Sequence, residues 1–398
     1  MFKRKSLSNL GIGTWLIIFI QFISFFTFFM FVPFISTYFV NQLDFSLAFV
    51  GTVLSLRIIS QQGLMVFGGF LADRFGYKRL AISGFVCRGV GFIGLGLTDQ
   101  PLLIIIAIIL SGLGGAMFIP ALKATLTMFT PPERSKEAFS MMNVVENAGS
   151  VMGPLAGLFF KGEDFLLLCL ISGSLFLVIG FIVLFLPNPP LLKRHNSWIE
   201  ESLKIIRHRN FILLVCTLMP FHFIYQQLYL TFPIISEKLT GSSSWIFSFV
   251  TVNIILLQMP VLHWFRDRSM KAIFVLPYLF IGLSFVILGY SEQMLPLIIA
   301  LISIAFGSMV LFPFFQDYVA DIAPKESLAT YFGFSNMAMA VGGSLGNLLG
   351  GVLYDLFIEI SKPQWFWLLL SIISILPIIG VTRLNHISSK SISKKRIS

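Results

Sequence analysis

Long apolar runs occupy most of this chain and leave it few ways to fold. Of its 398 residues, 56% are hydrophobic and only 12% are charged, and its mean hydropathy is +0.89. A soluble domain carries about 25% charged residues, so this chain has too little polar surface to cover a globule in water. We therefore expect most of its surface to face lipid.

The apolar runs are long enough for twelve membrane-spanning helices, each of which needs about 20 residues. Only helices and closed barrels can cross a bilayer, because backbone groups find no water partner there. Barrel strands would alternate polar and apolar residues over about 10 positions, and these runs do not. The sequence therefore predicts an all-α membrane protein with twelve transmembrane helices. The expected spans are 12–38, 46–71, 79–98, 101–122, 138–160, 164–186, 211–234, 244–264, 271–290, 294–317, 328–354 and 364–383.

The distribution of Lys and Arg predicts the orientation of these spans. Cytoplasmic segments of membrane proteins are enriched in Lys and Arg, and with a cytoplasmic N-terminus 23 of the 28 basic residues fall on that side. Both termini are then cytoplasmic, as an even number of spans requires. The basic residues lie in short segments between apolar runs, so the net charge of +10 does not indicate a nucleic-acid partner.

The chain also contains an internal repeat. A shift of 193 residues lays the segment 132–157 over 325–350 and aligns three glycines in each copy. The aligned glycines are Gly149, Gly153 and Gly157 with Gly342, Gly346 and Gly350. This repeat predicts two six-helix bundles, 1–190 and 208–398, joined by a cytoplasmic linker, 191–207, that contains an amphipathic helix.

The stretch GGFLADRFGYKRL, residues 68–80, concentrates charge between two apolar runs. Membrane topology explains its basic residues, but not the acid Asp73 or the glycines. Gly69 and Gly76 would allow a close backbone approach and a tight turn, and Asp73 could pair with Arg74 or with a helix N-terminus.

Residues 69–79 of this stretch, GxLADRxGxKR, resemble the signature loop of the major facilitator superfamily, and Tyr77 departs from the usual basic residue. The resemblance implies a fold of two pseudo-symmetric six-helix bundles and transport of small molecules. It also implies a gating role for Gly69, Asp73, Arg74 and Gly76. In the family this loop latches the two halves together on the cytoplasmic side and favours the outward-open state, with Asp73 facing the region near Leu328.

A second motif narrows the resemblance to one branch of the superfamily. The segment GxxxGPxxG, which consists of Gly149, Gly153, Pro154 and Gly157, is similar to the motif of drug:proton antiporters. The resemblance implies tight packing and a bend at the interface between the halves. The motif is incomplete, because Ser140 and Leu158 stand where glycines are common. The run 56–76 and the segments CRGVGF and LSGLGGAMF are similar to bacterial multidrug exporters of the MdtH type.

Charged residues inside spans are costly and usually persist for a reason. Glu146, three residues before the first motif glycine, is the main candidate for a proton carrier, since a carboxyl that alternates between two environments can load and release a proton. Alternatives are a fixed Glu–Arg pair and a position at the membrane edge. Asp317 is a second candidate, at the inner vestibule. Many members of this branch carry an Arg where this chain has Ile108, so a mechanism that depends on that Arg does not transfer.

Several other polar residues within spans are candidates for substrate contact: Arg57, Gln61, His222, Tyr225 and Gln226. Arg57 and Gln61 are one turn apart and form a polar stripe that could bind an anion or satisfy buried partners. His222 could instead be hydrogen-bonded and inert. Arg88 is expected to have a structural role.

These features predict a proton-coupled exporter of small amphipathic molecules that works by alternating access as a monomer in the cell membrane. The alternatives are export of a dedicated metabolite such as a siderophore or metallophore, proton-coupled uptake, and a non-transporting sensor. We find no nucleotide-binding, nucleophile or metal-ligand pattern in the sequence, so we expect no enzyme activity and no cofactor.

Overall fold

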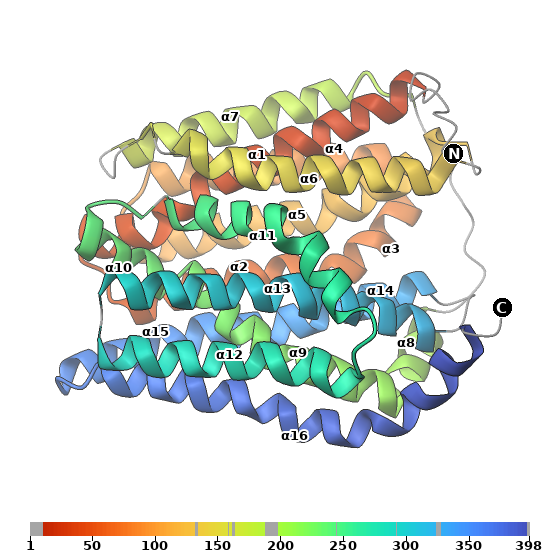
Figure 1. Ribbon diagram of the computed structural model, residues 1–398. Coiled ribbons are helices and arrows are strands. Elements are labelled where there is room, and N and C mark those ends of the chain that lie inside the picture. Colours follow the sequence, from red (N-terminus) through yellow and green to blue (C-terminus); the bar gives the residue numbers. More distant parts are fainter. Residues whose placement is uncertain are drawn as a thin grey trace. The chain divides into compact units, whose positions relative to one another are not determined.

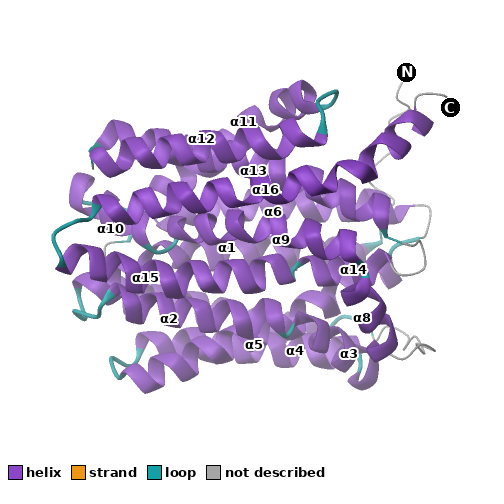
Figure 2. Ribbon diagram, turned by 90° about the horizontal axis from the view of Figure 1, so that it is seen from below, coloured by secondary structure: helices purple, strands orange, loops and turns teal. Residues whose placement is uncertain are grey.

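The chain is helical nearly throughout in the computed structural model (Figure 1). The structure describes residues 11–131, 134–157, 159–160, 164–187, 198–243, 245–291, 293–323 and 328–395. No strand occurs within these ranges, and short loops join the helices (Figure 2). Residues 1–10 and 188–197 lie outside the described residues, and with them the predicted basic N-terminus and part of the predicted linker, as does Leu158.

The helices follow the predicted spans, with interruptions in three of them. In chain order the elements are α1 (Ile12–Asn41), α2 (Leu47–Ile58), the π-helix η2 (Ile59–Gly63), α3 (Met65–Phe75), α4 (Tyr77–Gly96), α5 (Pro101–Phe129), α6 (Ser135–Gly157), α7 (Phe165–Val183), α8 (Trp198–Arg207), α9 (Arg209–Tyr225), the 3₁₀-helix η5 (Gln226–Leu228), α10 (Thr231–Thr240), α11 (Trp245–Phe265), α12 (Met270–Tyr290), α13 (Met294–Ile322), α14 (Leu328–Ser335), the π-helix η7 (Met339–Gly343), α15 (Ser344–Glu359) and α16 (Gln364–Lys395).

Nine helical stretches within the described residues are long and apolar enough to cross a membrane. The other three expected spans are present as helices, but each departs from a long continuous apolar run. Span 46–71 is divided into α2, η2 and α3, span 138–160 is the more polar α6, and span 364–383 is the first part of α16, whose apolar stretch ends at Ile378. The prediction of an all-α membrane protein is confirmed.

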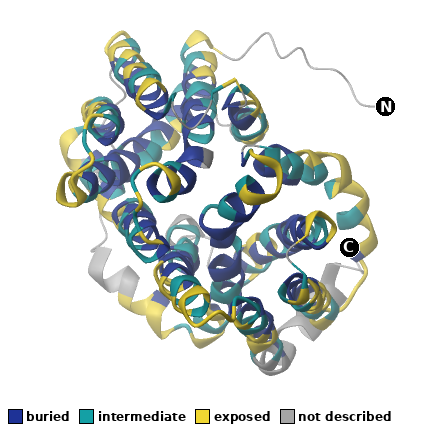
Figure 3. Ribbon diagram, turned by 90° about the vertical axis from the view of Figure 1, so that its left-hand side faces the viewer, coloured by how far each residue is buried: buried dark blue, intermediate teal, exposed yellow. Residues whose placement is uncertain are grey.

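Side-chain exposure agrees with a lipid environment. Large apolar side chains such as Leu256 and Leu283 are 69% and 61% exposed. Exposure of many such side chains to water would be unfavourable. Buried and exposed segments alternate around individual helices (Figure 3).

The helices pack into two compact units. The first consists of Met1–Val32 and Leu64–Arg194, and the second of Pro33–Gly63 and His195–Ser398. Relative to the predicted bundles, the units assign 33–63 to the second half, because α2 packs extensively on α15. The division of the chain into two six-helix bundles, 1–190 and 208–398, stays a prediction.

The glycines that the sequence repeat aligns make equivalent contacts in the two units. A methyl group on Gly149 would meet the backbone of Phe26 in α1 at 2.8 Å, and one on Gly342 would meet that of Met219 in α9 at 2.3 Å. The shift of 193 residues relates these two pairs to each other. Gly153 and Gly346 repeat the contact one turn further along the same helices. Each half therefore uses its glycines to bring two helix backbones together.

In the second unit, α2 and α15 are held in close backbone contact. A methyl group on Gly51 would lie 2.1 Å from the carbonyl oxygen of Asn347, and one on Gly351 would lie 2.3 Å from that of Leu47. The Asp355 carboxylate accepts hydrogen bonds from the backbone N–H groups of Leu47 and Ala48, at 3.2 and 2.7 Å. Asp355 thus caps the N-terminus of α2, where a negative charge is favourable.

The charged stretch 68–80, which was predicted as a loop, is helical except at Gly76, where the chain turns from α3 into α4. Gly76 has φ = 97° and so needs glycine. The expected close approach occurs at Gly68 and not at Gly69. A methyl group on Gly68 would lie 1.9 Å from the Ala116 carbonyl oxygen, whereas one on Gly69 would meet nothing within 4 Å. Lys78, in the first turn of α4, donates a hydrogen bond to the Leu186 carbonyl at 2.7 Å, which ties the start of α4 to the segment after α7.

Candidate functional site

A cluster of buried polar side chains lies in the second unit, where α2, α9 and η5 meet. Arg57 is the next-to-last residue of α2, is 7% exposed and interacts electrostatically with Tyr229. The side chains of Tyr225 and Tyr229 are hydrogen-bonded to each other. A buried cation and two phenols are expensive in an apolar unit and indicate a functional position.

Three helix interruptions converge on this cluster. The π-helix η2 begins two residues after Arg57, the 3₁₀-helix η5 begins at Gln226, and the π-helix η7 ends at Gly343. η2 contacts η7, and η7 contacts α2 and α9. A methyl group on Gly343 would lie 3.2 Å from Gln226 Nε2 and 3.4 Å from Ile58 Cδ1, so the three segments adjoin. Irregular backbone within a membrane protein is tolerated where it is buried in protein or lines a cavity, and π-bulges are frequent at functional sites.

Two buried amides extend the cluster toward α15. Asn347 Nδ2 donates a hydrogen bond to Gln226 Oε1 at 3.4 Å. Gln226 Nε2 and Asn347 Oδ1 have no hydrogen-bond partner among the described residues. These two atoms can therefore each take part in a further hydrogen bond.

Aromatic rings form the other side of the cluster. Phe312 of α13 packs against Phe221, His222 and Tyr225, with ring centroids 5.2 to 5.9 Å apart. His222 is 8% exposed, and its Nδ1 atom has no hydrogen-bond partner among the described residues. Substrate contact and an inert role for His222 both stay predictions.

The structure brings together Arg57, His222, Tyr225 and Gln226 of the residues predicted for substrate contact. Gln61 lies in η2 and is half-buried. Because the π-helix begins after Arg57, the two residues do not form the regular α-helical stripe that the sequence predicted.

Glu146 lies in the first unit and has a specific partner there. Gln21 Nε2 of α1 donates a hydrogen bond to Glu146 Oε1 at 2.7 Å. Gln21 is 1% exposed, whereas Glu146 is half-buried. The close contact of Gly149 with Phe22 and Phe26 holds α1 and α6 together one turn away, which fixes the amide beside the carboxyl.

The second proton-carrier candidate, Asp317, is exposed near the end of α13, where it interacts electrostatically with Tyr318. It belongs to the second unit and Glu146 to the first.

Arg88 donates a hydrogen bond from Nε to the Ser111 carbonyl at 3.1 Å and lies 5.1 to 5.6 Å from the ring centroids of Phe28, Phe118 and Phe176. These cation–π contacts support a structural role for Arg88.

The residues predicted for gating are divided between α3, which contains Gly69, Asp73 and Arg74, the turn at Gly76, and α6. Arg74 is exposed and lies 5.6 Å from the ring centroid of Phe75. The side chain of Asp73 lies outside the described residues. Pro154 is inside α6, and Gly157 is the last residue of that helix. The contacts given for Gly149 and Gly153 are with α1, so their role at the interface between the halves stays a prediction.

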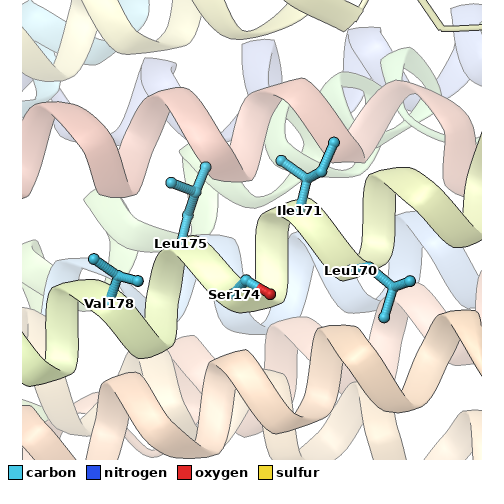
Figure 4. A pocket seen from close by; sticks show the side chains of 5 residues that line it. All are labelled: Leu170, Ile171, Ser174, Leu175 and Val178. Atoms are coloured by element: carbon cyan, nitrogen blue, oxygen red, sulfur yellow. The ribbon is translucent and has the colours of Figure 1, made fainter.

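An open pocket on the surface of α7 is not a candidate for the site. Its lining consists of Leu170, Ile171, Ser174, Leu175 and Val178, all from one helix (Figure 4). It has no titratable side chain. No three His, Cys, Asp or Glu residues are placed to hold a metal ion in the part of the chain that the structure describes.

The model of the major facilitator superfamily matches residues 17–347 and again 241–395. This chain belongs to the major facilitator superfamily. It is similar to the multidrug resistance protein MdtH of Yersinia pestis (strain Pestoides F), with 30% identity over 375 residues, 93% of this chain and 94% of that protein. The MdtH protein of Yersinia pseudotuberculosis serotype O:1b matches equally well. The resemblance to exporters of the MdtH type is thereby confirmed.

Solved structures of superfamily transporters share the fold. A mutant of the nucleoside transporter NupG has a TM-score of 0.80 and 14% identity, covering 94% of this chain and 99% of that chain. The POT family transporter PepTSo has a TM-score of 0.78 and 14% identity, covering 94% and 97%. At this identity the likeness concerns the fold, and the prediction of the major facilitator fold is confirmed. The chain is a transporter within a membrane.

Sequence reasoning missed two polar residues of these sites, Gln21 and Asn347. Each is a single amide within a long apolar run, and the runs contain many isolated Ser, Thr and Asn residues that carry no function. Their positions in the sequence could have marked them as candidates. Asn347 follows the repeat glycine Gly346, and Gln21 lies near the middle of the first span.

Proposed function

We propose that this transporter exports small amphipathic molecules in exchange for protons, by alternating access, as a monomer in the cell membrane with both termini cytoplasmic. The observation that carries the proposal is the convergence of three interrupted helices on the buried polar cluster around Arg57. In transporters, substrate sites form where discontinuous helices meet within the membrane. The similarity to MdtH multidrug resistance proteins supports amphipathic drugs as substrates.

The proposed substrate contacts are Arg57, Gln61, His222, Tyr225 and Gln226, together with Tyr229 of the same polar aromatic segment and Asn347. Tyr225 and Phe312 would cover an apolar ring of the substrate. Arg57 and the two amides would hold its polar group. The residues come from α2, η2, α9, η5 with the following Tyr229, and α15. A movement that separates these elements would dismantle the site and release the substrate.

Glu146 is the proposed proton carrier. Its hydrogen bond from Gln21 places a carboxyl in a mainly apolar helix pair with one polar partner, where a gain or loss of a proton changes the local hydrogen bonding. A fixed Glu–Arg pair, the main alternative for this residue, has less support because the hydrogen bond that the structure gives Glu146 comes from an amide. Asp317, which is exposed, is the second candidate for proton transfer.

Gating is proposed for the signature loop, whose Gly69, Asp73 and Arg74 lie in α3 and whose Gly76 turns the chain into α4, and for the helix packing of Gly149, Gly153, Pro154 and Gly157. The loop would hold the two halves together on the cytoplasmic side in one state and release them in the other. Gly76 would act by its positive φ angle, which sets the direction in which α4 leaves the turn.

Everted membrane vesicles with an acidic interior test the proposal. Addition of substrate is expected to make the lumen more alkaline, because antiport exports protons as substrate enters. Glu146→Gln is expected to abolish this proton movement, because an amide cannot exchange a proton in this range. Glu137→Gln, a change on the same helix in its first turn, is the matched control and should leave the signal unchanged.

The same assay separates the alternatives. Lumenal acidification on substrate addition would indicate symport, and no proton movement with any transported compound would contradict proton coupling. A response to one metallophore or siderophore, and to none of a panel of amphipathic drugs, would favour a dedicated metabolite exporter. An unchanged signal in Glu146→Gln would remove Glu146 from the mechanism.

A further inference from the structure

Polar side chains follow one side of α6 into the expected membrane. Asn143, Asn147 and Ser150 are spaced by four and three residues, which places them on the same side of a helix, and we call them the polar face of α6. Asn143 and Asn147 are exposed, and Ser150 is half-buried. Because α6 runs from Ser135 to Gly157, Asn147 lies near its middle. An amide exposed at that depth would lose its hydrogen bonds if it faced hydrocarbon, which is costly.

The other exposed side of α6 is apolar. Val144 and Met152 are both exposed, and Met152 lies about two and a half turns after Asn143, on the opposite side of the helix. A third side packs on α1 through Gly149 and Gly153. The helix thus has an apolar side suited to lipid and a packed side, and its polar face is distinct from both. We therefore infer that the polar face meets water.

The fold itself does not require polar residues at these positions. In the repeat of 193 residues, Asn147 corresponds to Ala340 and Ser150 corresponds to Gly343. Both residues are buried, and Gly343 adjoins Gln226. Packing therefore closes the equivalent positions in the second unit, whereas Asn147 in the first unit is exposed.

The polar face is open at one end and closed at the other. Pro154 and Gly157 continue the same side of α6, since they follow Ser150 by four and seven residues, and both are buried. Asn143, toward the start of the helix, is exposed. Water can therefore approach from the side on which α6 begins, which the proposed topology makes cytoplasmic.

Glu146 borders the polar face, since it immediately precedes Asn147. Its carboxyl accepts a hydrogen bond from the uncharged Gln21 of α1. That helix, Ile12–Asn41, contains no Asp, Glu, Lys, Arg or His that could pass a proton to Glu146. Water on the polar face can bring the proton, because side-chain amides both donate and accept hydrogen bonds and so can hold water beside the carboxyl.

We propose that the polar face of α6 lines a water-filled path, open toward the start of the helix, through which Glu146 exchanges its proton with the cytoplasm. The inference rests on the proposed function, which makes Glu146 the proton carrier, and it supplies the route by which an antiporter releases the proton inside the cell. Asn143 and Asn147 are positioning residues, since they hold the water and do not carry the proton themselves.

The first test compares the reactivity of single cysteines toward a membrane-impermeant methanethiosulfonate that carries a trimethylammonium group. Asn147→Cys is placed in a chain whose three cysteines are replaced by alanine, and Met152→Cys is the matched control on the apolar side. In everted vesicles, Asn147→Cys is expected to react about tenfold faster than Met152→Cys, because the reagent attacks the thiolate, which forms in water and not in lipid. Equal rates would overturn the path.

Intact cells, which present the opposite side of the membrane to the reagent, test the direction of the path. Asn147→Cys is expected to react several-fold more slowly there than in everted vesicles, because Pro154 and Gly157 close the other end. Equal rates from the two sides would overturn the opening toward the cytoplasm.

A second test does not depend on the cysteine replacements. Asn147→Leu is expected to slow proton movement several-fold in everted vesicles, measured with a compound that drives this movement in the unaltered protein. Asn147→Gln retains an amide and should restore most of the rate, which a purely structural role of Asn147 does not predict. Asn253→Leu is the control, because the Asn253 amide donates to the Phe249 carbonyl of its own helix. An unchanged rate in Asn147→Leu would overturn the role of Asn147.

The two tests together separate this inference from the proposed function. Fast reaction of Asn147→Cys in everted vesicles, with no proton movement driven by any transported compound, would uphold the water-filled path and contradict proton-coupled export. Proton movement that persists unchanged in Asn147→Leu, with equal reactivity of Asn147→Cys and Met152→Cys, would uphold export and overturn the inference.

Discussion

At the scale of single residues, the two proposed sites depend on polar side chains whose partners come from distant helices. Arg57, His222 and Gln226 could be predicted because charged and strongly polar residues are conspicuous in apolar spans. Their hydrogen-bond partners could not be predicted from the sequence. Asn347 lies 121 residues from Gln226 along the chain, and Gln21 lies 125 residues from Glu146. Only tertiary packing brings such isolated amides to a functional partner.

Gln21 offers the sharpest test at this scale. Gln21→Leu removes the donor to Glu146 and leaves the carboxyl without its hydrogen bond, which for a charged group is worth about 1.5–3 kcal/mol. We expect substrate-driven proton movement in everted vesicles to decrease by about tenfold, with the protein still present at normal amounts in the membrane.

The control for this prediction is Gln42→Leu, which changes an exposed glutamine just after α1 and should leave the proton signal unchanged. If Gln21→Leu transports and couples like the unaltered protein, the Gln21–Glu146 hydrogen bond has no role in coupling.

At the scale of elements, the predicted spans hold well where the chain is continuously apolar and fail where helices are interrupted. The sequence predicted unbroken helices over 46–71 and 328–354, whereas η2 and η7 divide them. A π-helix requires no particular composition, so hydropathy gives no sign of it. The two π-helices contact each other, and Gly343 at the end of η7 adjoins Gln226, so these interruptions are visible only in the packed chain.

Adjacent glycines in α3 test the helix packing directly. Gly68→Ala would place a methyl group 1.9 Å from the Ala116 carbonyl oxygen, so α3 and α5 must separate. We expect a loss of about 1–3 kcal/mol in stability, measured as a lower midpoint of thermal unfolding in detergent.

Gly69→Ala is the matched control, because a methyl group there meets nothing within 4 Å. It should leave the unfolding midpoint unchanged or raise it slightly, since alanine is the better helix former. Equal effects of the two substitutions would contradict the packing of α3 on α5.

At the scale of the whole molecule, the repeat of 193 residues is the feature that sequence and structure share most closely. Gly149 packs on α1 and Gly342 packs on α9 in the same register, which is expected if one six-helix unit was duplicated. The compact units nevertheless assign 33–63 to the second half. No sequence pattern indicates this assignment, because it follows from the packing of α2 on α15, which are far apart in the sequence.

The central claim, that a proton gradient drives substrate transport through this chain, is tested most directly with purified protein in proteoliposomes and a lumen more acidic than the medium. The account predicts uphill accumulation in the lumen of a compound that drives proton movement in the vesicle assay, collapse of this accumulation by a proton ionophore, and its absence with Glu146→Gln. Equilibration of that compound across the bilayer, at a rate independent of the gradient, would contradict the claim.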